Sequence, residues 1–250
     1  MEGTKNKVVG LMVLFIFPVL LATAQKKDLA YYQCAFFESY RAGNMAPWPG
    51  LIAEMEKVNS TDLLWQTEMV KAMYGLVGYQ LGAKNKDVAK IYVDKAGVYL
   101  DKLLDDHPEN AQLHSLAGAF CGFKIGLTFY KAPFMGPKSL YHIQKAIELD
   151  PFEPMGYIER GNSLLYRSAA LGGDKNEALR LYRKALKLME ASNNQKCNWQ
   201  QMLLRAFILK ALFETSQTAE ANAFMLGMQN DYGSMIWIKS FVGAGLMNGK

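Results

Sequence analysis

The stretch "AALGGDKNEALRLYRKALKL", residues 169–188, says more about the fold than any other part of the chain. The pair Gly172-Gly173 interrupts one helical pattern, and Asp174 stands where a second pattern begins. An aspartate at that position predicts an N-cap, because its carboxylate can accept hydrogen bonds from the free N–H groups of the first turn. The stretch therefore predicts a helix end, a glycine turn and a second helix.

The second helix of this stretch carries two apolar stripes and one basic stripe. The first apolar stripe lies at helical spacing, at positions 178, 181, 182, 185 and 188, and the second contains Leu179 and Leu186. Two apolar stripes predict burial on two sides, as inside a stack of helices. The basic stripe consists of Arg180, Arg183, Lys184 and Lys187. It predicts a solvated outer face, and an acidic protein or peptide partner is the functional alternative.

A phosphate loop is the other interpretation of this glycine pair. Such a loop needs a lysine followed by Ser or Thr, and it opens a helix after a strand. Here Asn176 follows Lys175, and the preceding residues have a helical pattern. The carboxylate of Asp174 would also repel a phosphate. We therefore expect a turn without phosphate binding.

Helical periodicity continues through the chain from Asp28 onward, and strand-like alternation is scarce. Pro108 and Pro151 each follow the acidic end of a predicted helix. The segment "KAPFMGP", 131–137, predicts a longer loop before a helix over 138–149. We expect an all-α domain over residues 25–250, built from about five helix pairs.

The segment 138–190 resembles the tetratricopeptide repeat. The matching positions are Pro151, Tyr157, Gly161, Ala178, Tyr182 and Ala185. The resemblance implies a right-handed superhelical stack of antiparallel helix hairpins, a TPR-like α-solenoid, with its best repeats at 109–151 and 152–190. It also implies that Gly161 and the small alanines let two helices approach closely, while the aromatic residues fill the space between repeats.

Proteins of this repeat family bind partners along a concave groove lined by the first helix of each pair. Carried over position by position, the resemblance implies groove residues at Gln112, Ser115, Asn162 and Tyr166. The function expected is a non-enzymatic scaffold of a bacterial cell envelope that binds a protein or peptide partner. The oligomeric state stays open.

Two further resemblances bear on function. The run "ALGGDKNEALRLYRKAL" is similar to the Gly-Gly-Asp turn in the helical T component of tripartite (TRAP) transporters. This implies, as the alternative function, a periplasmic subunit that binds a small ligand. The segment "YGSMIWIK", 232–239, looks like the closing segment of exported repeat proteins of Bacteroidetes-type bacteria. A capping helix is expected over about 234–247, with a membrane-surface or partner contact as the alternative.

The N-terminus has the three parts of a secretory signal peptide. Lys5 and Lys7 precede an apolar run over 8–22, and small residues follow it up to Ala24. The run has about 15 residues, fewer than the roughly 20 that span a bilayer. We expect a signal peptide over 1–24, cleavage after Ala24, and export to the periplasm or beyond without an integral membrane span.

Composition and residue spacing favour binding over catalysis. Lys and Arg number 28 against 23 Asp and Glu, for a net charge of +5, and no dense basic block predicts nucleic-acid binding. His107 is expected at a helix end, and His114 and His142 on helix surfaces. No catalytic, metal or cofactor constellation is expected. The small apolar neighbours of Cys121 predict a buried thiol. One disulfide between two of Cys34, Cys121 and Cys197 is an alternative, and the sequence does not identify the pair.

Overall fold

The computed structural model describes residues 27–192 and 196–243. Within these ranges the regular elements are all helical, as expected, and include no strand. The α-helices are α1 Leu29–Arg41, α2 Trp48–Lys57, α3 Leu63–Gly82, α4 Lys86–Asp106, α5 Ala111–Leu127, α6 Ala132–Leu149, α7 Pro154–Leu165, α8 Lys175–Ala191, α9 Trp199–Glu214, α10 Thr218–Tyr232 and α11 Ile238–Val242. Two short 3₁₀ helices are η1 Phe129–Lys131 and η2 Ala169–Leu171. The predicted signal peptide lies outside the described residues.

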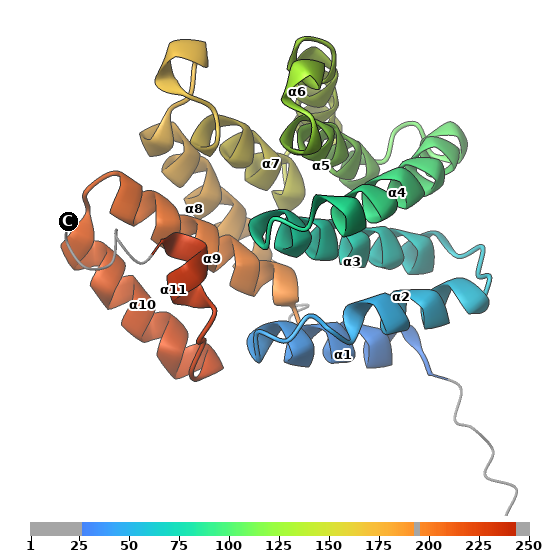
Figure 1. Cartoon of the computed structure of the whole chain (residues 1–250), viewed down its shortest axis with the longest axis horizontal. Coiled ribbons are helices and arrows are strands. Elements are labelled where there is room, and N and C mark those ends of the chain that lie inside the picture. Colours follow the sequence, from blue (N-terminus) through green and yellow to red (C-terminus); the bar gives the residue numbers. More distant parts are fainter. Residues whose placement is uncertain (1–26, 193–195, 244–250) are drawn as a thin grey trace, which may run out of the picture.

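Consecutive helices pack in pairs, and the pairs pack side by side (Figure 1). The pairs α3–α4, α5–α6 and α7–α8 have the largest contacts. Each pair meets the next, because α4 packs on α5, α6 on α7 and α8 on α9. The first helices of the pairs also contact one another, α3 with α5 and α5 with α7. One continuous apolar core runs through the arrangement.

The turn before α8 forms as the glycine and aspartate predict. Gly172 adopts a left-handed φ of 84°, which favours a residue without a side chain. The Asp174 carboxylate accepts hydrogen bonds from the backbone N–H groups of Asn176 and Glu177, both at 3.0 Å. The predicted N-cap is therefore confirmed, and its oxygen occupies the place that a phosphate would need.

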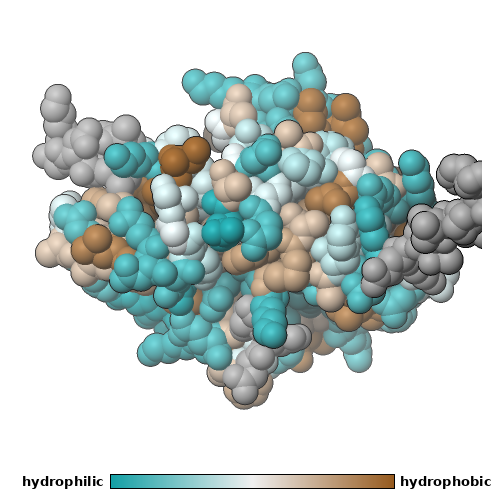
Figure 2. Space-filling view, turned by 90° about the horizontal axis from the view of Figure 1, so that it is seen from below, coloured by the Kyte–Doolittle hydropathy of each residue, from teal (hydrophilic) through white to brown (hydrophobic). Residues whose placement is uncertain are grey.

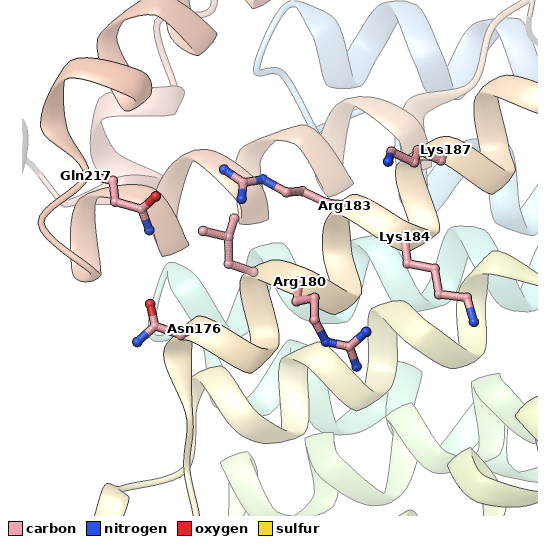
Figure 3. Close-up of a pocket in the computed structure, with 7 residues that line it drawn as sticks. Asn176, Arg180, Arg183, Lys184, Lys187 and Gln217 are labelled. Carbon is pink, nitrogen blue, oxygen red and sulfur yellow. The ribbon is translucent and has the colours of Figure 1, made fainter.

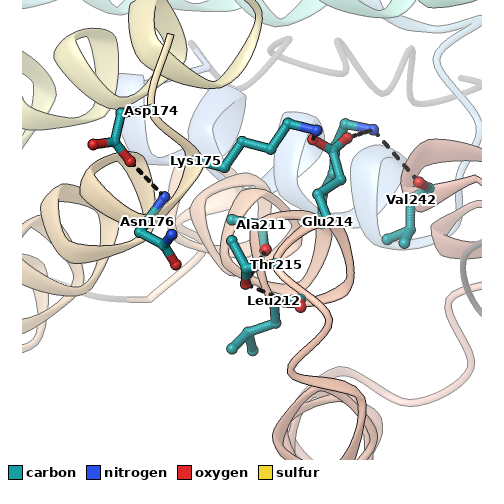
Figure 4. A network of polar contacts seen from close by, with 9 residues as sticks. Asp174, Lys175, Asn176, Ala211, Leu212, Glu214, Thr215 and Val242 are labelled. Atoms are coloured by element: carbon teal, nitrogen blue, oxygen red, sulfur yellow. Dashed lines mark hydrogen bonds and ion pairs between the residues drawn. The ribbon is translucent and has the colours of Figure 1, made fainter. Parts of the chain in front are cut away.

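Next to this cap, an ion-pair network joins the start of α8 to the end of α9 (Figure 4). Glu214 lies 3.1 Å from the Lys175 ammonium group and 2.8 Å from that of Lys210. Burial works to raise the pKa of the Glu214 carboxyl, but hydrogen bonds from Lys210 and Lys175 outweigh it, so the pKa is lowered. Lys210 also donates to the carbonyl of Val242 in α11 at 3.5 Å. The network thus links α8, α9 and the C-terminal helix.

The predicted loop at 131–137 is wrong, because α6 already begins at Ala132. Pro133 lies in the first turn, where backbone N–H groups have no partner within the helix, so its missing N–H costs nothing there. Pro137 lies further inside and removes one backbone hydrogen bond. The helix continues because Ser139, Ile143 and Ala146 bury one face against its neighbours.

Close approach of α7 and α8 depends on a glycine facing an aromatic ring. A Cβ atom on Gly161 would lie 2.4 Å from Cε1 of Tyr182, well inside van der Waals contact. Tyr182, Ala178 and Ala185 have no exposed surface. Pro151 lies in the turn before α7, where its carbonyl accepts a hydrogen bond from the Tyr157 hydroxyl at 3.1 Å.

Helix α1 closes the arrangement by packing on α9 and α3. Cys34 of α1 forms a disulfide with Cys197, just before α9. Aromatic rings continue this contact, since Tyr40 lies 5.7 Å from Trp199, and Trp48 of α2 lies 5.1 Å from Trp199, between ring centroids. Sequence alone left the cysteine pair undecided because 163 positions separate the two residues.

The C-terminal helix α11 is shorter than the predicted capping helix over about 234–247. It spans Ile238–Val242 and packs on α9, and residues 244–247 lie outside the described residues. None of the helices in the two described ranges is both long enough and apolar enough to cross a bilayer.

Replacing Gly161 with Ala is expected to lower the free energy of unfolding by about 1–3 kcal/mol, because the added methyl group would overlap the Tyr182 ring. Urea denaturation followed by circular dichroism measures this difference. Gly78→Ala in α3 is the matched control, since no atom lies within 4 Å of the added Cβ. The control should be neutral or stabilising, because Ala favours a helix over Gly. Equal losses in both variants would contradict the close-packing explanation.

Removing the disulfide with Cys34→Ser and Cys197→Ser together is expected to lower the free energy of unfolding by about 2–5 kcal/mol, because the bond restricts a long loop in the unfolded chain. Thermal unfolding with and without a reducing agent checks this. The reductant should lower the Tm of the unmodified chain and leave that of the double variant unchanged. A reductant effect of equal size on both would rule out this bond as its target.

Candidate functional site

The centre of the molecule holds a buried polar cluster contributed by three helices. The Tyr74 hydroxyl of α3 donates to the Glu159 carboxylate of α7 at 2.8 Å. Asn162 donates to the same carboxylate at 3.2 Å and accepts from the hydroxyl of Tyr182 on α8 at 2.8 Å. Burial raises the pKa of Glu159 to about 7, against the lowering effect of the hydrogen bonds from Tyr74 and Asn162.

Little free space remains at this centre. A cavity of about 10 Å³ lies among residues of α3, α7 and α9, including Tyr74, Met155 and Gln200. This is about the room that one water molecule needs. This cavity is too small for a ligand larger than a water molecule, because side chains from three helices fill the space around it.

The four residues predicted to line a groove do not form one open surface. Ser115 is fully buried, and its hydroxyl donates to the carbonyl of Ala111 one turn earlier. Asn162 is held in the central cluster. Gln112 is half-buried, and Tyr166 exposes 62% of its surface at the end of α7. Of the four, Tyr166 is therefore the residue most accessible to a partner.

Cys121 is buried, as predicted, and it forms no disulfide. Burial raises the pKa of its thiol, so the thiolate that a nucleophile needs is disfavoured. Among the described residues, no group of three or more His, Cys, Asp or Glu side chains is placed to hold a metal ion.

The prediction that both histidines lie on helix surfaces is wrong for His114. It is buried on α5, and its Nδ1 lies 2.9 Å from Nδ1 of the half-buried His142 on α6. The Pro108 carbonyl, 2.9 Å from Nε2 of His114, can only accept, so Nε2 must carry a proton. In the neutral pair, Nδ1 of His142 is then the donor between the rings. Burial, with the charges of His114 and Lys138, lowers the pKa of His142 to about 4.

An open groove of about 430 Å³ lies over α8 and the start of α10 (Figure 3). We call it the α8 groove. Its lining residues are Asn176, Leu179, Arg180, Arg183, Lys184, Lys187 and Gln217. Its four cations are the basic stripe that the sequence predicts, whereas Gln217 lies just before α10, which only the tertiary structure brings alongside α8. No acidic side chain lines the groove.

Three of the four cations of the α8 groove make contacts at its edges. The Arg180 guanidinium group donates two hydrogen bonds to the Glu177 carboxylate, at 2.7 and 2.6 Å. The Arg183 guanidinium group lies 2.5 Å from the Glu220 carboxylate on α10. Lys184 lies 3.9 Å above the Tyr157 ring. Exposed ion pairs of this kind are worth about 0–1 kcal/mol, so an incoming anion can compete for these side chains. The groove can therefore bind carboxylate or phosphate groups.

The surface in general is mixed. Seen from below, hydrophilic side chains surround separate hydrophobic patches (Figure 2). A binding surface on this molecule must therefore be recognised from a local concentration of charge or of exposed aromatic side chains.

No protein-family model and no curated protein sequence matches the chain. A solved structure does: the HusA haemophore from Porphyromonas gingivalis is 17% identical, with a TM-score of 0.61. The match covers 76% of this chain and 96% of the haemophore. At this identity the likeness shows a shared helical fold alone.

Changing Glu159 to Gln is expected to remove a pH dependence of stability. Because the carboxyl has a folded pKa of about 7 against an ordinary value of 4.5, it contributes most stability below about pH 4.5 and loses that contribution as the pH rises through 7. The free energy of unfolding of Glu159→Gln, relative to that of the unmodified chain, should therefore rise by roughly 3 kcal/mol between these two pH values.

Urea denaturation at a series of pH values measures this difference. Glu148→Gln, at an exposed position on α6, is the control and should show no such gain. If Glu159→Gln and the unmodified chain kept a constant difference across this pH range, the carboxyl would not be protonated in the folded state.

Proposed function

We propose that this chain is an exported, non-enzymatic scaffold of the cell envelope that holds an acidic segment of a partner protein in the α8 groove. The groove carries the proposal, because four cations share one open surface with no acidic side chain lining it. We also propose that the helix pairs form the right-handed, TPR-like stack that the sequence implies, with its partner surface on α8 and α10.

An acidic peptide fits the chemistry of the groove. Two guanidinium groups can each bind a carboxylate through paired hydrogen bonds, and two ammonium groups add charge without fixed geometry. Leu179 supplies an apolar floor against which the carbon chains of acidic residues can pack. The open shape suits an extended segment better than a compact ligand.

The side chains that could serve chemistry are engaged in structural contacts. Cys121 is buried with a raised thiol pKa, and His114 and His142 bond to each other. Glu159, whose pKa of about 7 would suit a proton-transfer role, is enclosed by Tyr74 and Asn162. These contacts support binding without catalysis.

A carrier of a small ligand is the second candidate, and the likeness to the HusA haemophore favours it. Such a carrier would bind a small ligand, as would the periplasmic transport subunit that the resemblance of the Gly-Gly-Asp turn implies. Haem carries two carboxylates, which the groove cations could bind. The groove lining contains no His, Tyr, Cys or Met side chain that could bind the iron, so we place this function second.

The variant Lys184→Glu/Lys187→Glu is expected to weaken binding of a fluorescein-labelled oligoglutamate peptide by roughly tenfold or more, because two attractive charges become repulsive. Fluorescence anisotropy at low salt measures this affinity. Lys86→Glu/Lys102→Glu, two exposed changes on α4, makes the same change in net charge away from the groove. An equal loss in both variants would show that net charge, and not the groove, binds the peptide.

Two further measurements separate the candidates. A pull-down from envelope extract should recover one stoichiometric protein with the control variant and lose it with Lys184→Glu/Lys187→Glu. A haemin titration followed by visible absorbance should show no saturable shift of the Soret band. A shift that saturates at one equivalent, without a protein partner, would reverse the order of the two candidates.

A further inference from the structure

The hairpin of α5 and α6 carries a charge pattern unlike that of the rest of the chain. Between Glu109 and Glu148 there is no acidic residue, and four lysines occur in that interval, Lys124, Lys131, Lys138 and Lys145. Helix α6 lies at the edge of the molecule, packed on α5 and α7 (Figure 1). Two of these lysines, Lys138 and Lys145, lie on this outer helix, and Lys131 lies just before it.

The tip of this hairpin exposes three large aromatic side chains within six residues. Phe129, Tyr130 and Phe134 expose 76%, 77% and 76% of their surface. Lys131 lies among them and is also exposed. Large apolar side chains that cluster on a surface mark a site of interaction, whereas single exposed ones need no explanation.

The same pattern continues along the outer face of α6. Phe134, Lys138, Tyr141 and Lys145 follow one another at spacings of four, three and four residues, which places them on one side of a helix. Tyr141 exposes 61% of its surface. The opposite side is buried through Ile143 and Ala146. One side of the helix is thus apolar and packs on the core, while aromatic and basic side chains alternate along its outer face.

We propose that the tip of the α5–α6 hairpin and the outer face of α6 form a docking surface for an anionic lipid bilayer. Phe and Tyr side chains settle at the level of the lipid headgroups, and lysines beside them attract anionic lipid. A protein partner fits less well, because lysine is depleted in the cores of protein interfaces. The aromatic residues would enter the headgroup layer while the core of the molecule stays outside the bilayer.

The test uses the chain from Gln25 to Lys250, which contains all the described helices and lacks the apolar N-terminal run that would itself enter lipid. Flotation with vesicles of phosphatidylglycerol and phosphatidylcholine measures binding. The unmodified chain should float with these vesicles, less so at high salt, and stay unbound with vesicles of phosphatidylcholine alone.

Two variants locate the surface. Phe129→Ser/Phe134→Ser should reduce the partition coefficient by roughly tenfold or more, and Lys131→Gln/Lys138→Gln should do the same by removing two charges. Phe152→Ser is the matched control, because Phe152 is also 76% exposed but lies beyond the other end of α6. It should bind like the unmodified chain. Circular dichroism and the Tm confirm that each variant is folded.

The proposal is overturned if the unmodified chain fails to float with the anionic vesicles at low salt. It is also overturned if Phe152→Ser loses as much binding as Phe129→Ser/Phe134→Ser. Unchanged vesicle binding by folded Phe129→Ser/Phe134→Ser would likewise overturn it and leave a protein partner as the occupant of the exposed aromatic residues.

Discussion

The packing of α1 against α9 is the contact on which the rest of the arrangement depends. In a linear stack of helix pairs, each pair contacts only its neighbours along the chain. Here the disulfide Cys34–Cys197 and the rings of Tyr40, Trp48 and Trp199 bring the first helix across to the ninth. Gly75 of α3 lies so close to both tryptophans that an added Cβ would overlap them. The contact therefore holds α1, α2, α3 and α9 together.

The buried polar cluster at the centre of the molecule has a structural role. Side chains that could line an open groove instead bond to one another, with Tyr74, Glu159, Asn162 and Tyr182 in a single network. Burying a carboxyl group costs free energy unless the group is hydrogen-bonded. The raised pKa of Glu159 reflects the cost that remains after its hydrogen bonds are made. The network joins α3, α7 and α8 at fixed positions, so it specifies how these helices align.

The two binding surfaces that we propose lie on outer helices. The second helices of the pairs, α6 and α8, each keep one side free while the other side packs into the core. On α8 that side carries the four cations of the α8 groove, and on α6 it alternates aromatic side chains and lysines. The two surfaces differ in chemistry, since the first lacks exposed aromatic residues in its lining and the second presents them. This difference is why we propose an acidic peptide for the first surface and a lipid interface for the second.

The sequence by itself determined the local features of this protein. Helical periodicity, the N-cap at Asp174 and the basic stripe on α8 depend on residues within one or two turns of each other, so spacing reveals them. The burial of Cys121 also followed from its small apolar neighbours. The tertiary structure decided which cysteines pair, that His114 is buried beside His142, and that Asn162 faces Tyr74 at the centre. These contacts join residues separated by 163, 28 and 88 positions. Local propensity carries no information about such pairs, because they form only when distant helices bury their apolar faces together.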